Sequence, residues 1–203
     1  MITADGTTLL HWNYFLTVEE DLQRLSRYVD FAEPNFETYS IEMTRLLFAA
    51  AAEADIVAKQ LCGRLRPGSR ADNMDHYREI LCANLPVLQR AGVRIPRYGL
   101  TLAPWSNWLE NRNPDWWHAY NDVKHRRHAE YPSANLRHTL NAVGGLFVLL
   151  LFFYREEASS GELAPNPTLL DLGEPFGRNA VLYHASGARL YSLDVLEQPS
   201  LNN

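Results

Sequence analysis

One short stretch of this sequence gathers the side chains best suited to acid–base chemistry. Residues 116–128 read WWHAYNDVKHRRH and include three histidines, a lysine and an asparagine. A neutral histidine can accept a proton near neutral pH, whereas lysine and asparagine can hold a phosphate or an oxyanion. The rest of the chain offers no carboxylate pair, glycine-rich phosphate loop or nucleophile elbow, so this stretch is the candidate site.

Helical spacing separates this stretch into two stripes, because residues three and four positions apart share one face of an α-helix. Apolar side chains dominate one stripe, which we expect to face the core, while polar side chains gather on the other at the edge of the fold. The apolar stripe contains Trp116, Tyr120, Val123 and Arg127, and the polar stripe contains Trp117, Asn121, Lys124, His125 and His128.

Hydrophobic periodicity and helix-start residues predict the elements that position this stretch. Five helical segments are expected, with Ser40 and Ser133 as N-caps of two of them. The predicted segments cover residues 17–30, 40–63, 72–91, 114–128 and 133–156. Residues 92–105 mix proline, glycine and apolar residues without a helical period, which predicts an ordered loop or a short extended segment.

The carboxy-terminal sequence differs in pattern from the helical part. Two alternating segments, AVLYHA and ARLYSL, flank Ser186-Gly187 and predict a β-hairpin, which a polar linker precedes. The predicted fold class is therefore all-α, a four- to five-helix bundle with a small carboxy-terminal β-hairpin. The expected division is a helical bundle over residues 1–156 and a linker and hairpin tail over residues 157–203.

Composition limits the function classes. The chain has 203 residues, is 46% hydrophobic and carries a formal charge of -5, so an anion site must be local. Cys62 and Cys82 lack the spacing of a zinc site or a disulfide framework, which favours a reduced, cytoplasmic protein. The amino terminus lacks the pattern of a signal peptide. The apolar run at 142–154 is shorter than the ~20 residues of a membrane span, which predicts a buried core helix. We expect no metal, cofactor or membrane partner.

The run YNDVKH at 120–125, on a helix that leads into a long apolar helix, resembles the signature helix of the HEPN family. These all-helical domains occur in prokaryotic toxins, CRISPR effectors and other phage-defence proteins. The common motif of the family is an arginine, often followed by an asparagine, with a histidine four to six residues beyond the arginine. This chain resembles a divergent branch with a Tyr-Asn-x-x-Lys-His signature. HWNYF at 11–15 and the helix from residue 40 suit the same bundle, so the resemblance covers residues 10–156.

The resemblance implies a protein of a defence or toxin-antitoxin system that acts on RNA, with a metal-independent ribonuclease site where two copies meet. In the family, the histidine activates the ribose 2′-hydroxyl, the arginine stabilises charge on the phosphate, and the polar residue after the arginine orients them. His125 matches the histidine and Asn121 the polar residue, but Tyr120 stands where the arginine is expected. Lys124 completes the candidate catalytic set.

Several interpretations remain open at the level of sequence. The missing charge could come from Lys124, Arg126 or Arg112, although lysine lacks the planar fork of arginine. His125 could instead be a half-buried histidine hydrogen-bonded to Asn121 or to a carboxylate on a facing helix.

Two residues of the second predicted helix are candidate supporting groups. Asp55 and Lys59 lie one turn apart, a spacing typical of an intrahelical ion pair. Alternatively, Glu53 or Asp55 faces Lys124 and His125 across the bundle and fixes the imidazole tautomer. The alternative function is a non-catalytic helical subunit that engages a partner protein, nucleotide or RNA. The composite sites of the family imply a homodimer that pairs the predicted helices over residues 114–128 and 133–156.

Overall fold

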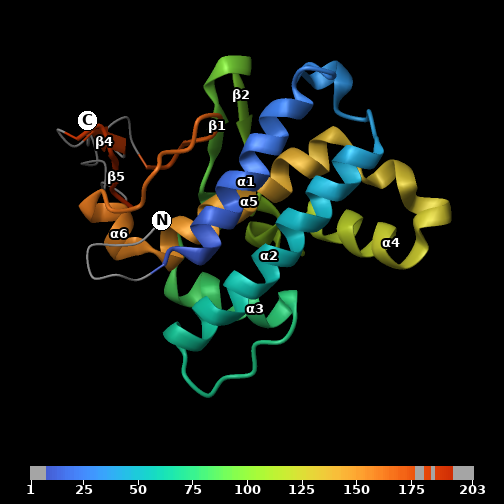
Figure 1. Cartoon of the computed structure of the whole chain (residues 1–203). Helices are drawn as coiled ribbons and strands as arrows, with labels where there is room; N and C mark the ends of the chain where they lie inside the picture. Colours follow the sequence, from blue (N-terminus) through green and yellow to red (C-terminus); the bar gives the residue numbers. More distant parts are fainter. Residues whose placement is uncertain (1–7, 177–180, 184–185, 194–203) are drawn as a thin grey trace, which may run out of the picture.

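The computed structural model of the chain describes residues 8–176, 181–183 and 186–193. Most of these residues are helical, and short antiparallel strands complete the fold (Figure 1). The described helices are α1 (Leu10–Leu25), α2 (Ile41–Leu65), α3 (Met74–Asn84), α4 (Asp115–Glu130), α5 (Leu136–Phe153) and α6 (Arg155–Ser160). The described strands are β1 (Val93–Ile95), β2 (Leu100–Leu102), β3 (Asp171–Leu172), β4 (Val181–Tyr183) and β5 (Arg189–Tyr191). A helical fold with a small hairpin is thus confirmed.

Helix α5 lies at the centre of the fold. It packs along α2 and also contacts α1 and α4, and its side chains from Leu146 to Phe153 are all buried. By length and composition α5 could cross a membrane, but 83% of its apolar window is buried inside the fold. A helix that is apolar on all sides and covered by neighbouring elements is a core helix, as the sequence predicted for residues 142–154.

Side-chain caps mark the starts of α2 and α5. Ser40 accepts a hydrogen bond from the backbone N–H of Met43 at 3.1 Å, so α2 begins where the sequence predicts. The predicted cap of α5 was wrong, because Asn135 rather than Ser133 accepts from the backbone N–H of His138, at 3.0 Å. Ser133 belongs instead to a short 3-10 turn that precedes the helix.

The predicted bounds of two other helices also differ from the structure. Helix α1 begins at Leu10, well before the expected residue 17, because the buried side chains of Trp12 and Phe15 anchor its first turns without a side-chain cap. Helix α3 ends at Asn84 rather than near residue 91. The residue before a proline disfavours the helical conformation, and Pro86 follows Leu85 directly.

A three-stranded antiparallel sheet joins two distant parts of the chain. Strands β1 and β2 form a hairpin within residues 92–105, and Gly99 takes a φ of 63° at its turn. Strand β3 pairs with the other edge of β1, where Arg94 lies opposite Asp171 and forms an ion pair with it at 2.8 Å. The extended alternative for residues 92–105 is confirmed.

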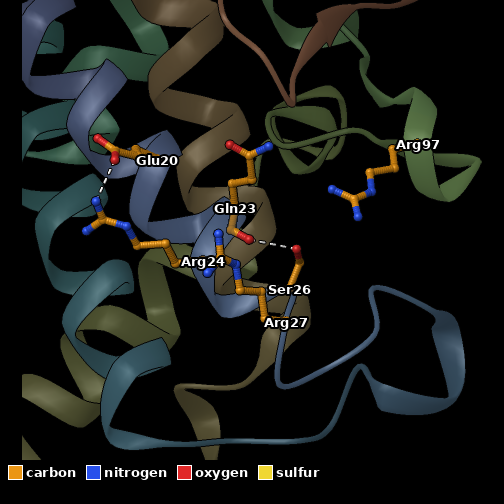
Figure 2. Close-up of a pocket in the computed structure, with 6 residues that line it drawn as sticks. All are labelled: Glu20, Gln23, Arg24, Ser26, Arg27 and Arg97. Carbon is orange, nitrogen blue, oxygen red and sulfur yellow. Dashed lines mark hydrogen bonds and ion pairs between the residues drawn. The ribbon is translucent and has the colours of Figure 1, made fainter.

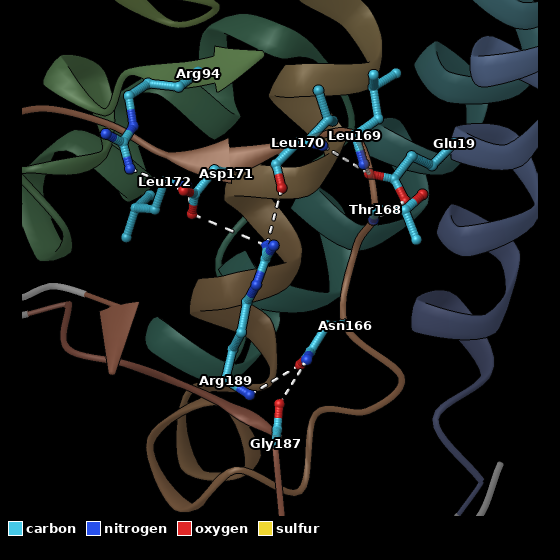
Figure 3. Close-up of polar contacts among 10 residues, drawn as sticks. All are labelled: Glu19, Arg94, Asn166, Thr168, Leu169, Leu170, Asp171, Leu172, Gly187 and Arg189. Carbon is cyan, nitrogen blue, oxygen red and sulfur yellow. Dashed lines mark hydrogen bonds and ion pairs between the residues drawn. The ribbon is translucent and has the colours of Figure 1, made fainter. Parts of the chain in front are cut away.

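The segment that follows α6 is fixed to α1 by a buried carboxylate. Glu19 is only 2% exposed. Its carboxylate accepts the consecutive backbone N–H groups of residues 168–170, at 2.9, 3.0 and 2.8 Å (Figure 3). The indole N–H of Trp12 donates to the carbonyl oxygen of Pro165 at 3.1 Å. Residues beyond the predicted boundary at 156 therefore contribute to the same core as the helices.

The predicted carboxy-terminal hairpin is confirmed as an antiparallel pair of strands. Strands β4 and β5 pair with Tyr183 opposite Arg189. The structure has a turn and a bend at residues 186 and 187, where a turn is expected, and His184 and Ala185 lie outside the described residues. The guanidinium of Arg189 donates to the carbonyl oxygen of Leu170 at 3.1 Å (Figure 3), which ties the hairpin to the segment held by Glu19.

Candidate functional site

Helix α4 carries the candidate residues, and its apolar stripe faces the core as predicted. Trp116, Tyr120 and Val123 are buried. The indole N–H of Trp116 donates to the carbonyl oxygen of Pro104 at 2.8 Å, and its ring packs edge-on against Trp105. These contacts fix the rotation of α4 and direct its polar stripe away from α5.

The regular backbone of α4 is interrupted near its end. Arg126 has a φ of -134° and a ψ of 39°, outside the helical region. Its guanidinium is ion-paired with Asp122 and with Glu130, at 3.5 Å in the second case. Arg127 consequently does not continue the buried stripe. It is exposed, and its guanidinium carbon lies 5.4 Å from the ring centroid of Phe48 on α2.

The three candidate catalytic residues differ in their exposure. Lys124 and His125 are exposed, and His125 forms no hydrogen bond or ion pair with another residue in the described part of the chain. Asn121 is half-buried, and its side-chain amide donates to the carbonyl oxygen of Trp117 at 3.0 Å. The expectation of a hydrogen bond between His125 and Asn121 was therefore wrong. The imidazole is free to meet a ligand.

Tyr120 occupies the position where the family motif places arginine. Its ring is buried and packs edge-on against Phe48, with the centroids 5.1 Å apart, and also contacts Trp117. The ammonium group of Lys124 lies 5.2 Å from the Tyr120 ring centroid. An aromatic face attracts a nearby cation. Tyr120 therefore supplies no charge itself but holds the Lys124 ammonium group over its ring.

The other arginines considered for the missing charge are both paired with carboxylates. Arg112 is bound to Glu110 at 2.7 Å and lies 3.7 Å from Asp115 at the start of α4. Arg126 is held by Asp122 and Glu130 as described above. Their carboxylate partners already balance these charges, which leaves Lys124 and Arg127 as the cations of α4 available to a ligand.

The predicted supporting residues of α2 lie elsewhere. The hydroxyl of Tyr77 on α3 donates to Asp55 at 3.0 Å, and burial together with the Asp55 charge raises the pKa of Tyr77. Glu53 is hydrogen-bonded to His11 of α1, with 2.6 Å between Oε1 and Nδ1. Neither carboxylate is paired with Lys124 or His125, so the expected arrangement across the bundle was wrong.

The physical reason is the distance along α2. Helix α4 meets α2 at Phe48, and seven residues separate Phe48 from Asp55, a rise of about 10 Å. Lys59 is exposed, and within the described residues it forms no ion pair with Asp55. The intrahelical pair was therefore wrong as well, because Asp55 turns toward Tyr77.

The free thiols provide no competing nucleophile. Burial raises the pKa of Cys62 to about 11 and also raises the pKa of Cys82. A thiol attacks as the thiolate, so the raised pKa values disfavour attack by either cysteine near neutral pH. Among the described residues, no group of three or more histidines, cysteines or carboxylates is placed to hold a metal ion.

A groove between α2 and the end of α4 was missed by sequence reasoning, and Asn121, Lys124 and His125 are not among the residues that line it. Its volume is about 680 Å³, and Phe48 links it to the ring of Tyr120. The groove is lined by Ile41, Thr44, Arg45, Phe48, Arg127 and Tyr131. Arg45 is paired with Asp21 and Glu42. Within the described residues Arg127 has no carboxylate partner, so it supplies the free charge at the rim of the groove.

One sequence signal could have indicated this groove. The large apolar residue Ile41 directly follows the cap Ser40 at the start of α2, where the structure leaves it 80% exposed. The rest of the groove forms because α2 contacts α4 and because the helix is interrupted at Arg126. Hydrophobic periodicity predicts neither feature. No family model, curated protein or solved structure matches this chain.

Proposed function

We propose that this protein is a HEPN-like component of a prokaryotic defence or toxin-antitoxin system that acts on RNA through α4. The observation that carries the proposal is the exposed His125 of α4, which has no hydrogen bond or ion pair within the described residues, on the same helix that supplies Arg127 to an apolar groove. RNA presents base faces that stack on aromatic side chains and phosphates that bind cations. Phe48 offers an aromatic ring for a base, and Arg127 offers a cation for a phosphate.

The proposed chemistry is metal-independent cleavage of the RNA backbone. A neutral His125 accepts the proton of a ribose 2′-hydroxyl, whose oxygen attacks the adjacent phosphorus and displaces the 5′-oxygen of the next nucleotide. Lys124 stabilises the negative charge that develops on the phosphate. The side-chain NH₂ of Asn121 donates to the carbonyl oxygen of Trp117, which leaves the side-chain oxygen of Asn121 available to the substrate.

Cleavage also requires an acid for the leaving oxygen, in addition to His125 as the base. We propose that a second copy provides it in a cytoplasmic homodimer formed through α4. Helix α5, an initial candidate for the dimer surface, is buried within the fold and does not contribute. Light scattering at micromolar concentration is expected to give twice the mass of the chain. A monomer under these conditions contradicts the dimeric site.

A second candidate is a non-catalytic subunit that binds RNA, a nucleotide or a partner protein with the same surface. The buried Tyr120 favours this candidate, because the cation of the family motif is replaced by a packing residue. In this case the groove and Arg127 bind the ligand without turnover.

The two candidates are separated by RNA cleavage with the purified protein. His125→Ala is expected to lower the cleavage rate by at least about 100-fold, the usual contribution of a general base. His118→Ala is the matched control, because His118 is an exposed histidine at the other end of α4. Cleavage should persist in the presence of a chelator.

Cleavage that is unchanged by His125→Ala, or that is lost with the chelator, contradicts the proposed catalysis. Stoichiometric RNA binding without cleavage, weakened by Arg127→Gln, supports the non-catalytic candidate. Wild-type protein that neither binds nor cleaves RNA rejects both RNA functions.

A further inference from the structure

A second pocket lies at the opposite end of α1 from Leu10 and is separate from the α4 site. It has a volume of about 320 Å³ and opens between the last turns of α1 and the connection from β1 to β2 (Figure 2). The residues that line it are Glu20, Gln23, Arg24, Ser26, Arg27 and Arg97. Three arginines thus line one small pocket in a chain with a net charge of -5.

The arginines of this pocket are not equally available. Arg24 is bound to Glu20 at 2.5 Å and to Asp21 at 3.2 Å, so its charge is balanced. Arg27 and Arg97 form no ion pair with a carboxylate in the part of the chain that the structure describes. Two guanidinium groups therefore line the pocket with uncompensated charge, and each presents donors that match phosphate geometry.

The walls of the pocket are held in place by packing. The ring of Tyr98, next to Arg97, contacts the buried ring of Phe31 with 5.0 Å between their centroids. This contact fixes the strand connection against the segment that follows α1. Figure 2 shows the Arg97 side chain extending from that connection toward α1, opposite Gln23 and Ser26. Arg97 therefore lies across the pocket from the helix.

The last carbonyl oxygens of α1 have hydrogen-bond partners. A helix C-terminus is unfavourable for anions because its last carbonyl oxygens lack partners. Here the carbonyl oxygens of Gln23, Arg24 and Leu25 accept hydrogen bonds from Ser26, from residue 27 and from residues 28–29 respectively. This end of α1 therefore presents fewer unpartnered carbonyl oxygens to a bound anion.

We propose that this pocket binds a small phosphorylated molecule of mononucleotide size, with its phosphate between Arg27 and Arg97. Pockets for small molecules usually measure about 300–1,000 Å³, so the observed volume suits a single nucleotide and not an oligonucleotide. The proposal does not depend on the α4 site. An anion bound here would bridge α1 and the strand connection through Arg27 and Arg97.

Calorimetric titration of the full chain with 5′-AMP, inorganic phosphate and adenosine tests the proposal. AMP and phosphate are expected to bind, whereas adenosine is not. Arg27→Gln and Arg97→Gln should each weaken AMP binding about tenfold or more, as expected for loss of a charged hydrogen bond. Arg97→Lys should be intermediate, because it keeps the charge without the planar fork.

Arg90→Gln is the matched control. Arg90 is an exposed arginine outside the pocket, and its substitution removes the same charge as Arg27→Gln or Arg97→Gln. It should bind AMP like the wild type. Melting curves of all variants should coincide, because the substituted side chains are exposed. No saturable AMP binding, adenosine binding equal to that of AMP, or an Arg90→Gln variant weakened as much as Arg97→Gln each overturns the proposal. RNA cleavage measured in parallel reports on α4 independently.

Discussion

At the scale of single residues, the most constrained polar group is Glu19. It accepts three backbone N–H groups from residues 168–170 while almost completely shielded from water. A buried carboxylate is tolerated only when hydrogen bonds replace its hydration. The periodicity of α1 places Glu19 near Leu22 and Leu25 on the buried face, where a charge is unexpected, and only the folded carboxy-terminal segment explains it.

Glu19→Gln is expected to lower the free energy of unfolding by about 2–3 kcal/mol. The neutral amide accepts more weakly, and its NH₂ group faces N–H donors instead of acceptors. Urea denaturation measures the change. Glu20→Gln is the matched control on the next residue, because its 61% exposed ion pair with Arg24 should contribute only about 0–1 kcal/mol. Equal effects of the two substitutions would show that the hydrogen-bonded cluster contributes little.

At the scale of elements, sequence signals worked where local chemistry determines the backbone. Ser40 starts α2, and Trp116, Tyr120 and Val123 of α4 are buried as spacing predicts, up to the interruption at Arg126. Sequence signals failed where tertiary packing determines the bounds of a helix. Buried aromatic side chains allow α1 to begin at Leu10, seven residues before the expected residue 17. The interruption at Arg126 was not predictable from the sequence, because α4 contains no proline or glycine.

Two glycines with open surroundings test how backbone conformation determines stability. A Cβ at Gly63 or Gly99 would meet nothing within 4 Å, but Gly63 is inside α2 and Gly99 has a φ of 63°. Gly63→Ala is expected to stabilise the fold by about 0.5–1 kcal/mol, because alanine favours helix. Gly99→Ala should destabilise it by about 1–2 kcal/mol through left-handed strain. Thermal unfolding compares them, and shifts of the same sign contradict this explanation.

At the scale of the whole molecule, the carboxy-terminal segment belongs to the helical core. Its apolar side chains are buried against the helices, although they follow α6 in the sequence. The buried residues beyond α6 include Leu163, Leu169, Leu170, Leu172, Phe176, Tyr191 and Leu193. Together with Glu19 and β3, they make the division at residue 156 a boundary in composition and not in packing.

Removal of residues 161–203 is therefore expected to abolish cooperative folding. Each buried leucine or phenylalanine contributes about 1.5–3 kcal/mol, so the lost burial is comparable to the whole stability of a domain, about 5–15 kcal/mol. Circular dichroism during heating measures the result. A truncated chain that melts cooperatively at the midpoint of the full chain would show that the tail is an appendage.

The sequence by itself determined the helical class, the central apolar helix, the hairpin pattern and the face of α4 that carries Asn121, Lys124 and His125. These features depend on periodicity and on residues close together in the chain. Only the tertiary structure decided the partners of Glu19, Asp55 and Arg127, the groove between α2 and α4, and the pocket at Arg97. Such contacts join residues far apart in sequence, and their positions depend on how the elements pack against one another.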